Sequence, residues 1–318
     1  MNKLIAVLGP TATGKTELAL RLALAFDGEV VGADSRQVYR GMDVGTAKPT
    51  VEQRARARHW LIDVVDPDEE FSLGRYLDLA QAALSDIWSR GRLPVLAGGT
   101  GQYVWALLEN WQVPRVPPDW SLRRQLEERA GRYGPQVLRA ELAALDPDAA
   151  TRIDPHNVRR LVRALEVVLR TGQPLSACRT RRPPDFQWAA IGLELPVTEL
   201  YRRIDARVEA MMAAGLVEEV RSLLARGYAP SLPAMSGIGY RQVCQHLNGE
   251  LTLEEAAARI KTETHRLSRM QRNWFRRSDS RVHWIDASRG DPFEEAAPVV
   301  EAELGLEGKA PVGAARGR

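Results

Sequence analysis

The chain has 318 residues, of which 44% are hydrophobic, and its 44 Lys and Arg residues against 41 Asp and Glu residues give a formal net charge of +3. This length and apolar content suffice for one large domain or for a core with an inserted lobe, and no apolar run approaches the roughly 20 residues that span a bilayer. Two cysteines, Cys178 and Cys244, are too few for a disulfide framework and match no metal-binding pattern. Met1–Lys3 lead straight into an apolar segment, which leaves no room for a signal peptide, so we expect a cytoplasmic protein.

The first hundred residues alternate between short apolar runs and amphipathic stretches. Strands that alternate with helices form a parallel sheet with helices on both faces, so the fold class is expected to be α/β. The expected strands lie at residues 4–8, 28–34, 59–67 and 93–99, and the expected helices at residues 17–26 and 72–91.

The segment between the first strand and the first helix reads GPTATGKT and fits the pattern G-x-x-x-x-G-K-[ST]. In that position the backbone N–H groups and the helix N-terminus bind phosphate, Lys15 adds a positive charge, and Thr16 can hold Mg²⁺. The core is therefore P-loop NTPase-like, although the motif does not specify what the phosphates are attached to. The residues expected to bind the di- or triphosphate are Gly9, Pro10, Thr11, Ala12, Thr13, Gly14, Lys15 and Thr16.

Asp34 ends the second expected strand, in the stretch VGADSRQVYRGMDVGTAKP. Ligands of open parallel sheets lie beyond the carboxyl ends of the strands, so Asp34 should face the same crevice as the P-loop. A carboxylate repels phosphate and is better suited to accept a proton from an incoming nucleophile. The alternative is a turn or capping acid that pairs with Ser35 or Arg36.

An ATP-hydrolysing P-loop protein also has an acid at the end of a buried strand, where it helps to hold Mg²⁺. The strand expected at 93–99 is followed by Thr100 and offers no acid. Asp63 and Asp66 are alternative metal ligands, but Asp66 precedes a proline, so we favour turn acids. This pattern weakens an ATPase interpretation and leaves it open.

A proline-rich stretch around Pro114 is followed by helices without strands, until a returning strand is expected at 186–196. We therefore expect an inserted all-helical domain within the parallel-sheet core. The expected parts are the first part of the core at 1–118, the helical insertion at 119–179, the second part with a basic helix at 180–305, and a disordered tail at 306–318.

The clearest helix of the insertion is expected at residues 154–172. Asp154 can cap it, Pro155 suits its first turn, and Gly172 can end it. Its arginines Arg159, Arg160 and Arg163 lie off the apolar face. That face is formed by Val158, Leu161, Val162, Leu165, Val168 and Leu169.

Positive charge is concentrated in two segments. Residues 115–182 hold 14 Arg and 8 acids, a net charge of +6, and residues 259–281 hold 8 basic residues and 2 acids, again +6. Such clusters indicate a polyanionic partner such as nucleic acid, and Trp274 and Phe275 among the arginines of the second suit stacking on bases. The alternatives are a genome that favours Arg codons and a solvated Arg face over an aromatic core.

Together, seven motifs resemble bacterial tRNA dimethylallyltransferases, the tRNA isopentenyltransferases of the MiaA family. The resemblance runs from about Leu4 to Trp284, and its motifs are GPTATGKT, DSRQVYRGMDVGTAKP, HWLIDVVDP, LAGGTGQYVWALL, IDPHNVRRLVRALEVV, SGIGYRQ and Q-x-x-WFR. It implies transfer of a dimethylallyl group from its diphosphate to the exocyclic amine of the adenosine just 3′ of the tRNA anticodon. The implied ligands are dimethylallyl diphosphate, Mg²⁺ and the anticodon stem-loop.

The resemblance also implies roles for single residues. The general base falls on Asp34, the diphosphate-contacting arginine on Arg207, and the P-loop binds the prenyl diphosphate. His265 and Met270 stand where the family has Arg. The implied tRNA-contacting positions are Asp34, Ser35, Arg36, Gln37, Thr100, Arg123, Arg159, Arg160, Arg163, Gly239, Tyr240, Arg241, Arg269 and Gln271.

Three other functions compete with this interpretation. They are a prenyltransferase that acts on free adenine nucleotides, a P-loop small-molecule kinase, and a non-catalytic RNA-binding ATPase. The basic insertion argues against the first, because a mononucleotide needs no such lobe. We expect a monomer, because no exposed heptad or apolar stripe is evident.

Overall fold

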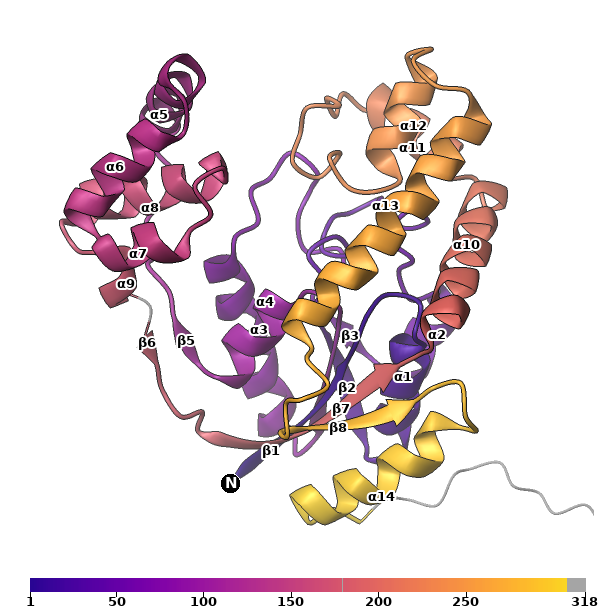
Figure 1. The fold of residues 1–318 in the computed structure, drawn as a ribbon. Coiled ribbons are helices and arrows are strands. Elements are labelled where there is room, and N and C mark those ends of the chain that lie inside the picture. Colours follow the sequence, from indigo (N-terminus) through magenta and orange to yellow (C-terminus); the bar gives the residue numbers. More distant parts are fainter. Residues whose placement is uncertain (179, 308–318) are drawn as a thin grey trace, which may run out of the picture. The chain divides into compact units, whose positions relative to one another are not determined.

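The computed structural model describes residues 1–178 and 180–307, which form two compact units (Figure 1). One unit combines Met1–Leu108 with the chain from Pro184 onwards, and the other is Glu109–Pro183. The second unit is longer than the expected insertion at 119–179, because β5 (Trp111–Gln112) pairs antiparallel with β6 (Thr180–Arg181). Most of the tail expected to be disordered, 308–318, lies outside the described residues.

The larger unit is built on a six-stranded parallel sheet in the order β3-β2-β4-β1-β7-β8, which confirms the α/β fold class. The central strand β1 pairs with β4 and β7, and its residues 4–8 are fully buried, as a strand covered on both faces requires. The strands are β1 (Asn2–Leu8), β2 (Gly28–Gly32), β3 (His59–Trp60), β4 (Leu93–Ala97), β7 (Phe186–Glu194) and β8 (Val282–Asp286).

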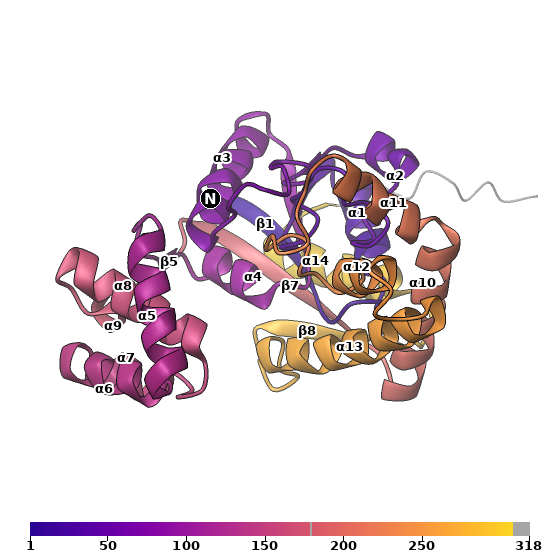
Figure 2. The same cartoon turned by 90° about the horizontal axis from the view of Figure 1, so that it is seen from above.

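Helices cover both faces of this sheet. Figure 2 shows α1 and α14 on one side of β1 and α3 and α4 on the other. Successive side chains of β1 alternate between the faces, and Ile5 and Val7 join the apolar core formed with α1 and α14. The covering helices are α1 (Lys15–Ala25), α3 (Leu73–Ser89), α4 (Gly101–Leu108) and α14 (Pro292–Leu304), and the short helix α2 (Val51–Arg56) contacts α1.

The structure differs from the expected elements at several places in this unit, and α2 and α4, for example, were not expected. β3 stops at Trp60, because Leu61 and Asp63 adopt positive φ angles of 61° and 57° and turn the chain out of the sheet. The stretch from 282 to 304, for which we expected no regular element, forms β8 and α14.

Four further helices pack together beside the sheet: α10 (Val197–Ala213), α11 (Leu216–Ala225), α12 (Tyr240–Leu247) and α13 (Leu253–Trp274). They share an apolar core with the segment that follows β2, including Val38 and Met42. The long basic helix α13 begins at a capping box in which Thr252 and Glu255 each bond the other's backbone N–H. Figure 1 shows α13 running beside α10 and α12.

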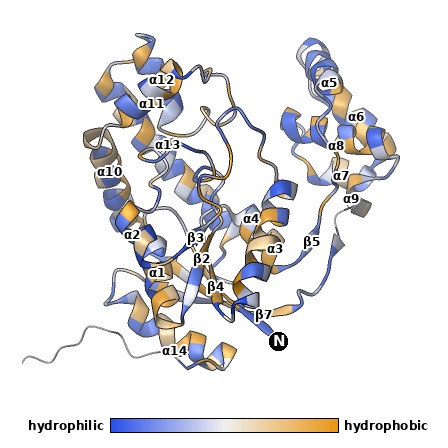
Figure 3. Cartoon of the chain, turned by 180° about the vertical axis from the view of Figure 1, so that it is seen from behind, coloured by the Kyte–Doolittle hydropathy of each residue, from blue (hydrophilic) through white to orange (hydrophobic). Residues whose placement is uncertain are grey.

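The smaller unit is a helical domain with its own core, in which Leu126, Leu142 and Leu165 are buried. Figure 3 shows hydrophobic and hydrophilic residues interspersed along its helices, as amphipathic helices require. Its helices are α5 (Trp120–Tyr133), α6 (Gln136–Leu145), α7 (Pro147–Arg152), α8 (Val158–Thr171) and α9 (Leu175–Cys178).

The helix expected at residues 154–172 starts later than predicted. Asn157 caps α8 by accepting the N–H of Arg160, whereas Asp154 bonds the N–H of His156 in the preceding turn. Gly172 ends the helix in the left-handed conformation, as expected. Leu169 was expected on the apolar face but is 47% exposed. Within the described part of the chain, no helix is long and apolar enough to cross a membrane.

Candidate active site at the carboxyl ends of the strands

The P-loop curls between β1 and α1. Gly14 adopts φ 97°, and Gly9 adopts φ 133° so close to β7 that an added Cβ would lie 2.4 Å from the Leu193 carbonyl oxygen. Both positions therefore require glycine. Buried Thr13 fixes the turn, because its Oγ1 donates to the Pro10 carbonyl oxygen at 2.9 Å.

Lys15 points back into this loop, where its Nζ donates to the Pro10 carbonyl oxygen at 2.5 Å. Burial of the amino group and the neighbouring positive charge of Arg207 lower its pKa to about 7, and Asp34 acts in the opposite direction. A lysine with such a pKa is only partly protonated at neutral pH, and an anion beside it favours the charged form.

Arg207 reaches the P-loop from α10, where its Nη1 donates to Thr11 Oγ1 at 3.1 Å. Burial lowers its pKa, and the charge of Asp34 partly offsets that effect. Neither Lys15 nor Arg207 forms an ion pair with a carboxylate of the described residues. Two partly buried cations without a paired anion form a site for a ligand anion.

Asp34 follows β2 and lines the same cavity of about 270 Å³ as Lys15, Thr16 and Arg207. Its Oδ1 accepts the N–H of Arg36 at 2.8 Å, so the expected turn contact exists through the backbone. The guanidinium of Arg36 points elsewhere, to the carbonyl oxygens of Pro233 and Ala234. The structure thus brings the expected acid and the two expected cations around one cavity.

Thr100 follows β4 and holds the turn after Asp34. Its Oγ1 accepts the N–H of Ser35 at 3.0 Å and donates weakly to the Ser35 hydroxyl at 3.4 Å. Thr100 was expected as a tRNA contact, and the structure gives its side chain an internal role in orienting the segment that carries Asp34.

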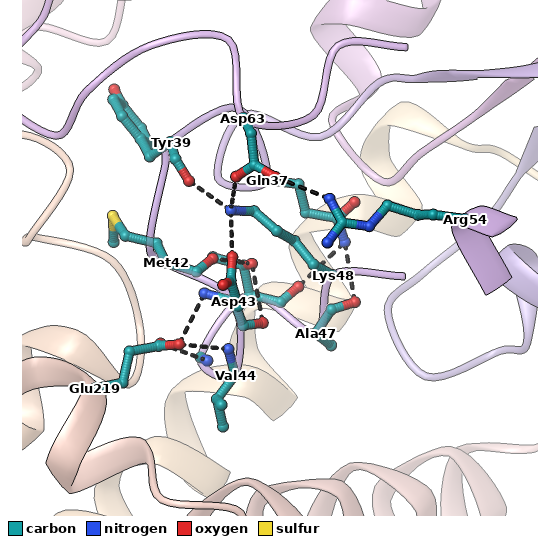
Figure 4. Close-up of polar contacts among 12 residues, drawn as sticks. Gln37, Tyr39, Met42, Asp43, Val44, Ala47, Lys48, Arg54, Asp63 and Glu219 are labelled. Atoms are coloured by element: carbon teal, nitrogen blue, oxygen red, sulfur yellow. Dashed lines mark hydrogen bonds and ion pairs between the residues drawn. The ribbon is translucent and has the colours of Figure 1, made fainter. Parts of the chain in front are cut away.

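The loop from Asp43 to Lys48 forms part of the cavity wall and is fixed from two sides (Figure 4). The buried ammonium of Lys48 donates to the Tyr39 carbonyl oxygen at 2.6 Å, to Asp43 at 2.6 Å and to Asp63 at 2.5 Å. The carboxylate of Glu219, on α11, accepts the N–H groups of residues 43, 44 and 45 at 2.8, 2.7 and 3.1 Å. The wall is therefore held by charge-assisted hydrogen bonds at both ends.

Two of the expected tRNA contacts form hydrogen bonds with this loop or with its anchor Glu219. Gln37 Nε2 donates to the carbonyl oxygens of Thr46 and Ala47 at 3.1 and 3.2 Å. Tyr240 is 1% exposed, and its hydroxyl donates to Glu219 Oε1 at 2.6 Å. The Tyr240 side chain therefore has no surface to offer to RNA. Sequence analysis missed Glu219 altogether, since it lies far along the chain in a helix without a motif.

A magnesium ion fits this site only together with ligand phosphates. Asp63 pairs with Lys48 and Arg54, and Asp66 with Arg40, which supports their expected role as turn acids. No group of three or more metal-ligating side chains occurs among the described residues. The Thr16 side chain lines the cavity at the start of α1, and Mg²⁺ typically takes one such oxygen plus substrate phosphates.

The arginines expected to contact tRNA from the helical unit fall into two kinds. Arg123 and Arg163 pair with the fully buried Glu166, at 2.8 and 2.5 Å. Burial raises the pKa of Glu166, but hydrogen bonds from Arg123, the Asp119 N–H and Arg163 outweigh it, so the pKa is lowered. Arg159 and Arg160 are exposed and form no ion pair with a described residue.

The tRNA contacts expected in the C-terminal part of the chain also fall into two kinds, exposed residues and buried residues. Arg269 is exposed, and its Nη1 donates to the Tyr201 hydroxyl at 2.6 Å, while the exposed Arg241 pairs with Glu263. Gly239 is buried and precedes α12. Gln271 is only 9% exposed and bonds the P-loop and the segment after β4.

His265 and Met270, the two departures from the family pattern, behave differently. The His265 ring stacks on Tyr201, with ring centres 4.0 Å apart, and its Nε2 lies 2.8 Å from Asp205 Oδ1. His265 thereby ties α13 to α10, the helix that carries Arg207. Met270 is 51% exposed.

Comparison with known proteins places these features in a family. The sequence model described as "IPP transferase" matches residues 37–278, and the one described as "Isopentenyl transferase" matches residues 2–71. The chain is 54% identical over 300 residues to the tRNA dimethylallyltransferase of Roseiflexus sp., covering 94% of this chain and 98% of the relative. It is 56% identical over 284 residues to that of Chloroflexus aurantiacus, covering 89% and 96%.

Solved structures agree with these relatives. The tRNA isopentenylpyrophosphate transferase of Bacillus halodurans is 38% identical, with a TM-score of 0.69 over 96% of this chain and 99% of that chain. A eukaryotic dimethylallyltransferase acting on tRNA is 25% identical, with a TM-score of 0.78 over 98% of this chain and 81% of that chain.

Proposed function

The chain belongs to the IPP transferase family of tRNA dimethylallyltransferases, and we propose that it transfers a dimethylallyl group from dimethylallyl diphosphate to the exocyclic amine of the adenosine 3′ of the tRNA anticodon. The observation that carries this proposal is the single cavity lined by Asp34, Lys15 and Arg207. It offers a proton acceptor beside two cations that lack a carboxylate partner.

Asp34 is the proposed general base. An adenine amine is a poor nucleophile because its lone pair is delocalised into the ring, so removal of its proton as the new bond forms assists the attack. The amine nitrogen bonds to the prenyl carbon as the C–O bond to diphosphate breaks. The bonding electron pair leaves with the diphosphate, and the amine proton passes to the Asp34 carboxylate.

Lys15, Arg207 and the P-loop N–H groups are proposed to stabilise the diphosphate leaving group. Negative charge grows on its oxygens as the C–O bond breaks, and donors held in place beforehand stabilise that charge without reorganising. The contact between Arg207 and Thr11 supports this role, since it holds the guanidinium at the P-loop.

Thr16 is the residue proposed to hold Mg²⁺, together with phosphate oxygens of the donor. When bound, the ion would neutralise part of the diphosphate charge. No acid of the described residues stands at the end of β4 where an ATPase would hold its metal, and the carboxylate of Asp63 is already paired. These two observations count against the kinase and ATPase alternatives.

The exposed arginines Arg159 and Arg160 of α8, Arg241 and Arg269 are proposed to contact the phosphates of the anticodon stem-loop. The target adenosine must leave its stack to reach the cavity, at a cost of a few kcal/mol that backbone contacts can offset. A monomer in the cytoplasm remains our expectation for the assembly and its location.

Labelled dimethylallyl diphosphate offered separately to tRNA and to AMP tests the proposal. We expect label in the tRNA and none in AMP. Equal or better labelling of AMP would establish the enzyme that acts on free nucleotides. Phosphate transfer from ATP without prenyl transfer would establish a kinase, and RNA binding without covalent change would establish an RNA-binding ATPase.

A further inference from the structure

The side-chain amide of Gln271, near the end of α13, bridges two loops of the active site. Its Oε1 accepts the N–H of Thr11 in the P-loop at 2.9 Å, and its Nε2 donates to the carbonyl oxygen of Gly99 at 2.9 Å. The residue is 9% exposed and lines the cavity together with Thr11 and Gly99. A buried amide that satisfies both of its polar ends fixes the groups it joins.

Gly99 permits this contact because it has no side chain. A Cβ added to Gly99 would lie 2.4 Å from Gln271 Nε2, and its other neighbours are 3.6 Å away or more. Gly99 does not adopt a positive φ angle, so alanine is compatible with its backbone. The amide of Gln271 is thus the one group that an alanine at this position must displace.

The end of α13 is also seated on the next turn of the same segment. A Cβ at Gly101 would lie 2.3 Å from Cβ of Trp274, and Trp105 Nε1 donates to the Trp274 carbonyl oxygen at 2.9 Å. Gln271 therefore extends from a helix end that is packed against this segment. This packing limits the movement of the Gln271 side chain and keeps its amide aligned with both partners.

The bridge continues to the cations of the cavity. The residue whose N–H Gln271 holds, Thr11, also accepts the hydrogen bond from Arg207 through its Oγ1 at 3.1 Å. The connected path is α13, Gln271, Thr11 and Arg207. Displacing the Gln271 amide would free the Thr11 backbone and loosen the anchor of the Arg207 guanidinium.

We propose that Gln271 is a positioning residue for the diphosphate, which acts through Thr11 and Arg207 rather than through a contact with tRNA. This inference rests on the proposed function for the identity of the anion. It differs from the role implied by family resemblance, in which Gln271 contacts tRNA.

The test is calorimetric titration of inorganic diphosphate, with Mg²⁺, into the full-length protein, both alone and with an anticodon stem-loop present. We expect Gln271→Ala and Gly99→Ala each to weaken diphosphate binding about tenfold, the value of one hydrogen-bonded anchor. The double variant should be no weaker than Gln271→Ala, because both changes remove the same bridge. Gln81→Ala, an exposed glutamine of α3, is the matched control.

Affinity for the stem-loop separates positioning from RNA contact. The proposal expects Gln271→Ala to bind the stem-loop within about twofold of the wild type, whereas Arg269→Ala should bind it more weakly with unchanged diphosphate affinity. Weaker stem-loop binding by Gln271→Ala with unchanged diphosphate affinity would overturn the inference. So would additive losses in the double variant. A wild type that binds diphosphate but transfers no prenyl group would overturn the proposed function alone.

Discussion

The cavity lined by Lys15, Arg207 and Asp34 and the helical unit Glu109–Pro183 both carry positively charged side chains, but the two regions differ in whether those charges are buried and paired. In the cavity, Lys15 and Arg207 are partly buried without a carboxylate ion pair, and burial lowers the pKa of both. In the helical unit, Arg123 and Arg163 pair with buried Glu166, while Arg159 and Arg160 lie exposed. An unpaired buried cation is costly and needs a ligand anion, whereas exposed arginines cost little and act collectively.

The largest effect should come from substitution of Asp34, which lines the cavity together with Lys15 and Arg207. Asp34→Asn keeps the shape of the side chain and removes the proton acceptor, so single-turnover transfer should fall about 10²–10⁴-fold. The affinity for tRNA should stay within about twofold of the wild type. Near wild-type turnover by this variant in rapid-quench experiments would disprove the general-base assignment.

Removal of a cavity cation should have the next largest effect. Arg207→Gln should lower kcat about 10²–10³-fold, the usual loss for one donor to a developing anion. Because Arg207 lowers the pKa of Lys15, the variant should also raise that pKa. Steady-state rates measured against pH would show both changes. A normal kcat in the variant would show that Arg207 does not stabilise the leaving group.

A substitution of Glu166 tests the helical unit, where the buried carboxylate pairs with two arginines. Glu166→Ala leaves Arg123 and Arg163 without their buried partner and should destabilise the helical unit by about 3 kcal/mol. Hydrogen exchange should show lost protection in α5 and α8, while diphosphate binding in the larger unit stays unchanged. Full protection in the variant would mean that the two arginines need no internal partner.

The exposed arginines should show a smaller, salt-dependent effect. Arg159→Ala combined with Arg160→Ala should weaken tRNA binding about tenfold and reduce the slope of log affinity against log salt by about 2. kcat at saturating tRNA should be unchanged. Arg92→Ala, at the amino end of β4, is the control, and equal slopes for the pair variant and the control would contradict a phosphate contact.

The smallest effect concerns the pKa of Lys15, which is about 7 in the free protein. Bound diphosphate favours charged Lys15 and raises this pKa, so binding takes up a proton above pH 7 and none well below it. Affinity should therefore fall about fivefold from pH 7 to pH 8. Calorimetry in buffers of different ionisation enthalpy measures the uptake, and Lys15→Met should lack this component.

The parts of the molecule that follow local rules could be predicted from the sequence. The P-loop, the buried β1 and the glycine end of α8 each depend on residues within one turn or strand. The early end of β3 depends on positive φ angles at Leu61 and Asp63. Leucine rarely adopts such an angle, so tertiary contacts decided where the strand ends.

Contacts between distant segments could not be predicted in the same way. Glu219 holds the loop that begins at Asp43, and Gln271 holds Thr11, from positions 176 and 260 residues further along the chain. The family resemblance implied the same tRNA-contacting role for buried Gln271 and Tyr240 as for exposed Arg269, because a motif does not show which of its side chains are buried.

The most direct test of the central claim is prenyl transfer to two anticodon stem-loops that differ in one base. One carries adenosine 3′ of the anticodon, and the other carries inosine, which lacks the exocyclic amine. With dimethylallyl diphosphate and Mg²⁺, nucleoside mass spectrometry should find the prenylated base only in the adenosine stem-loop. Equal modification of the inosine stem-loop, or none of either, would contradict prenyl transfer to the exocyclic amine.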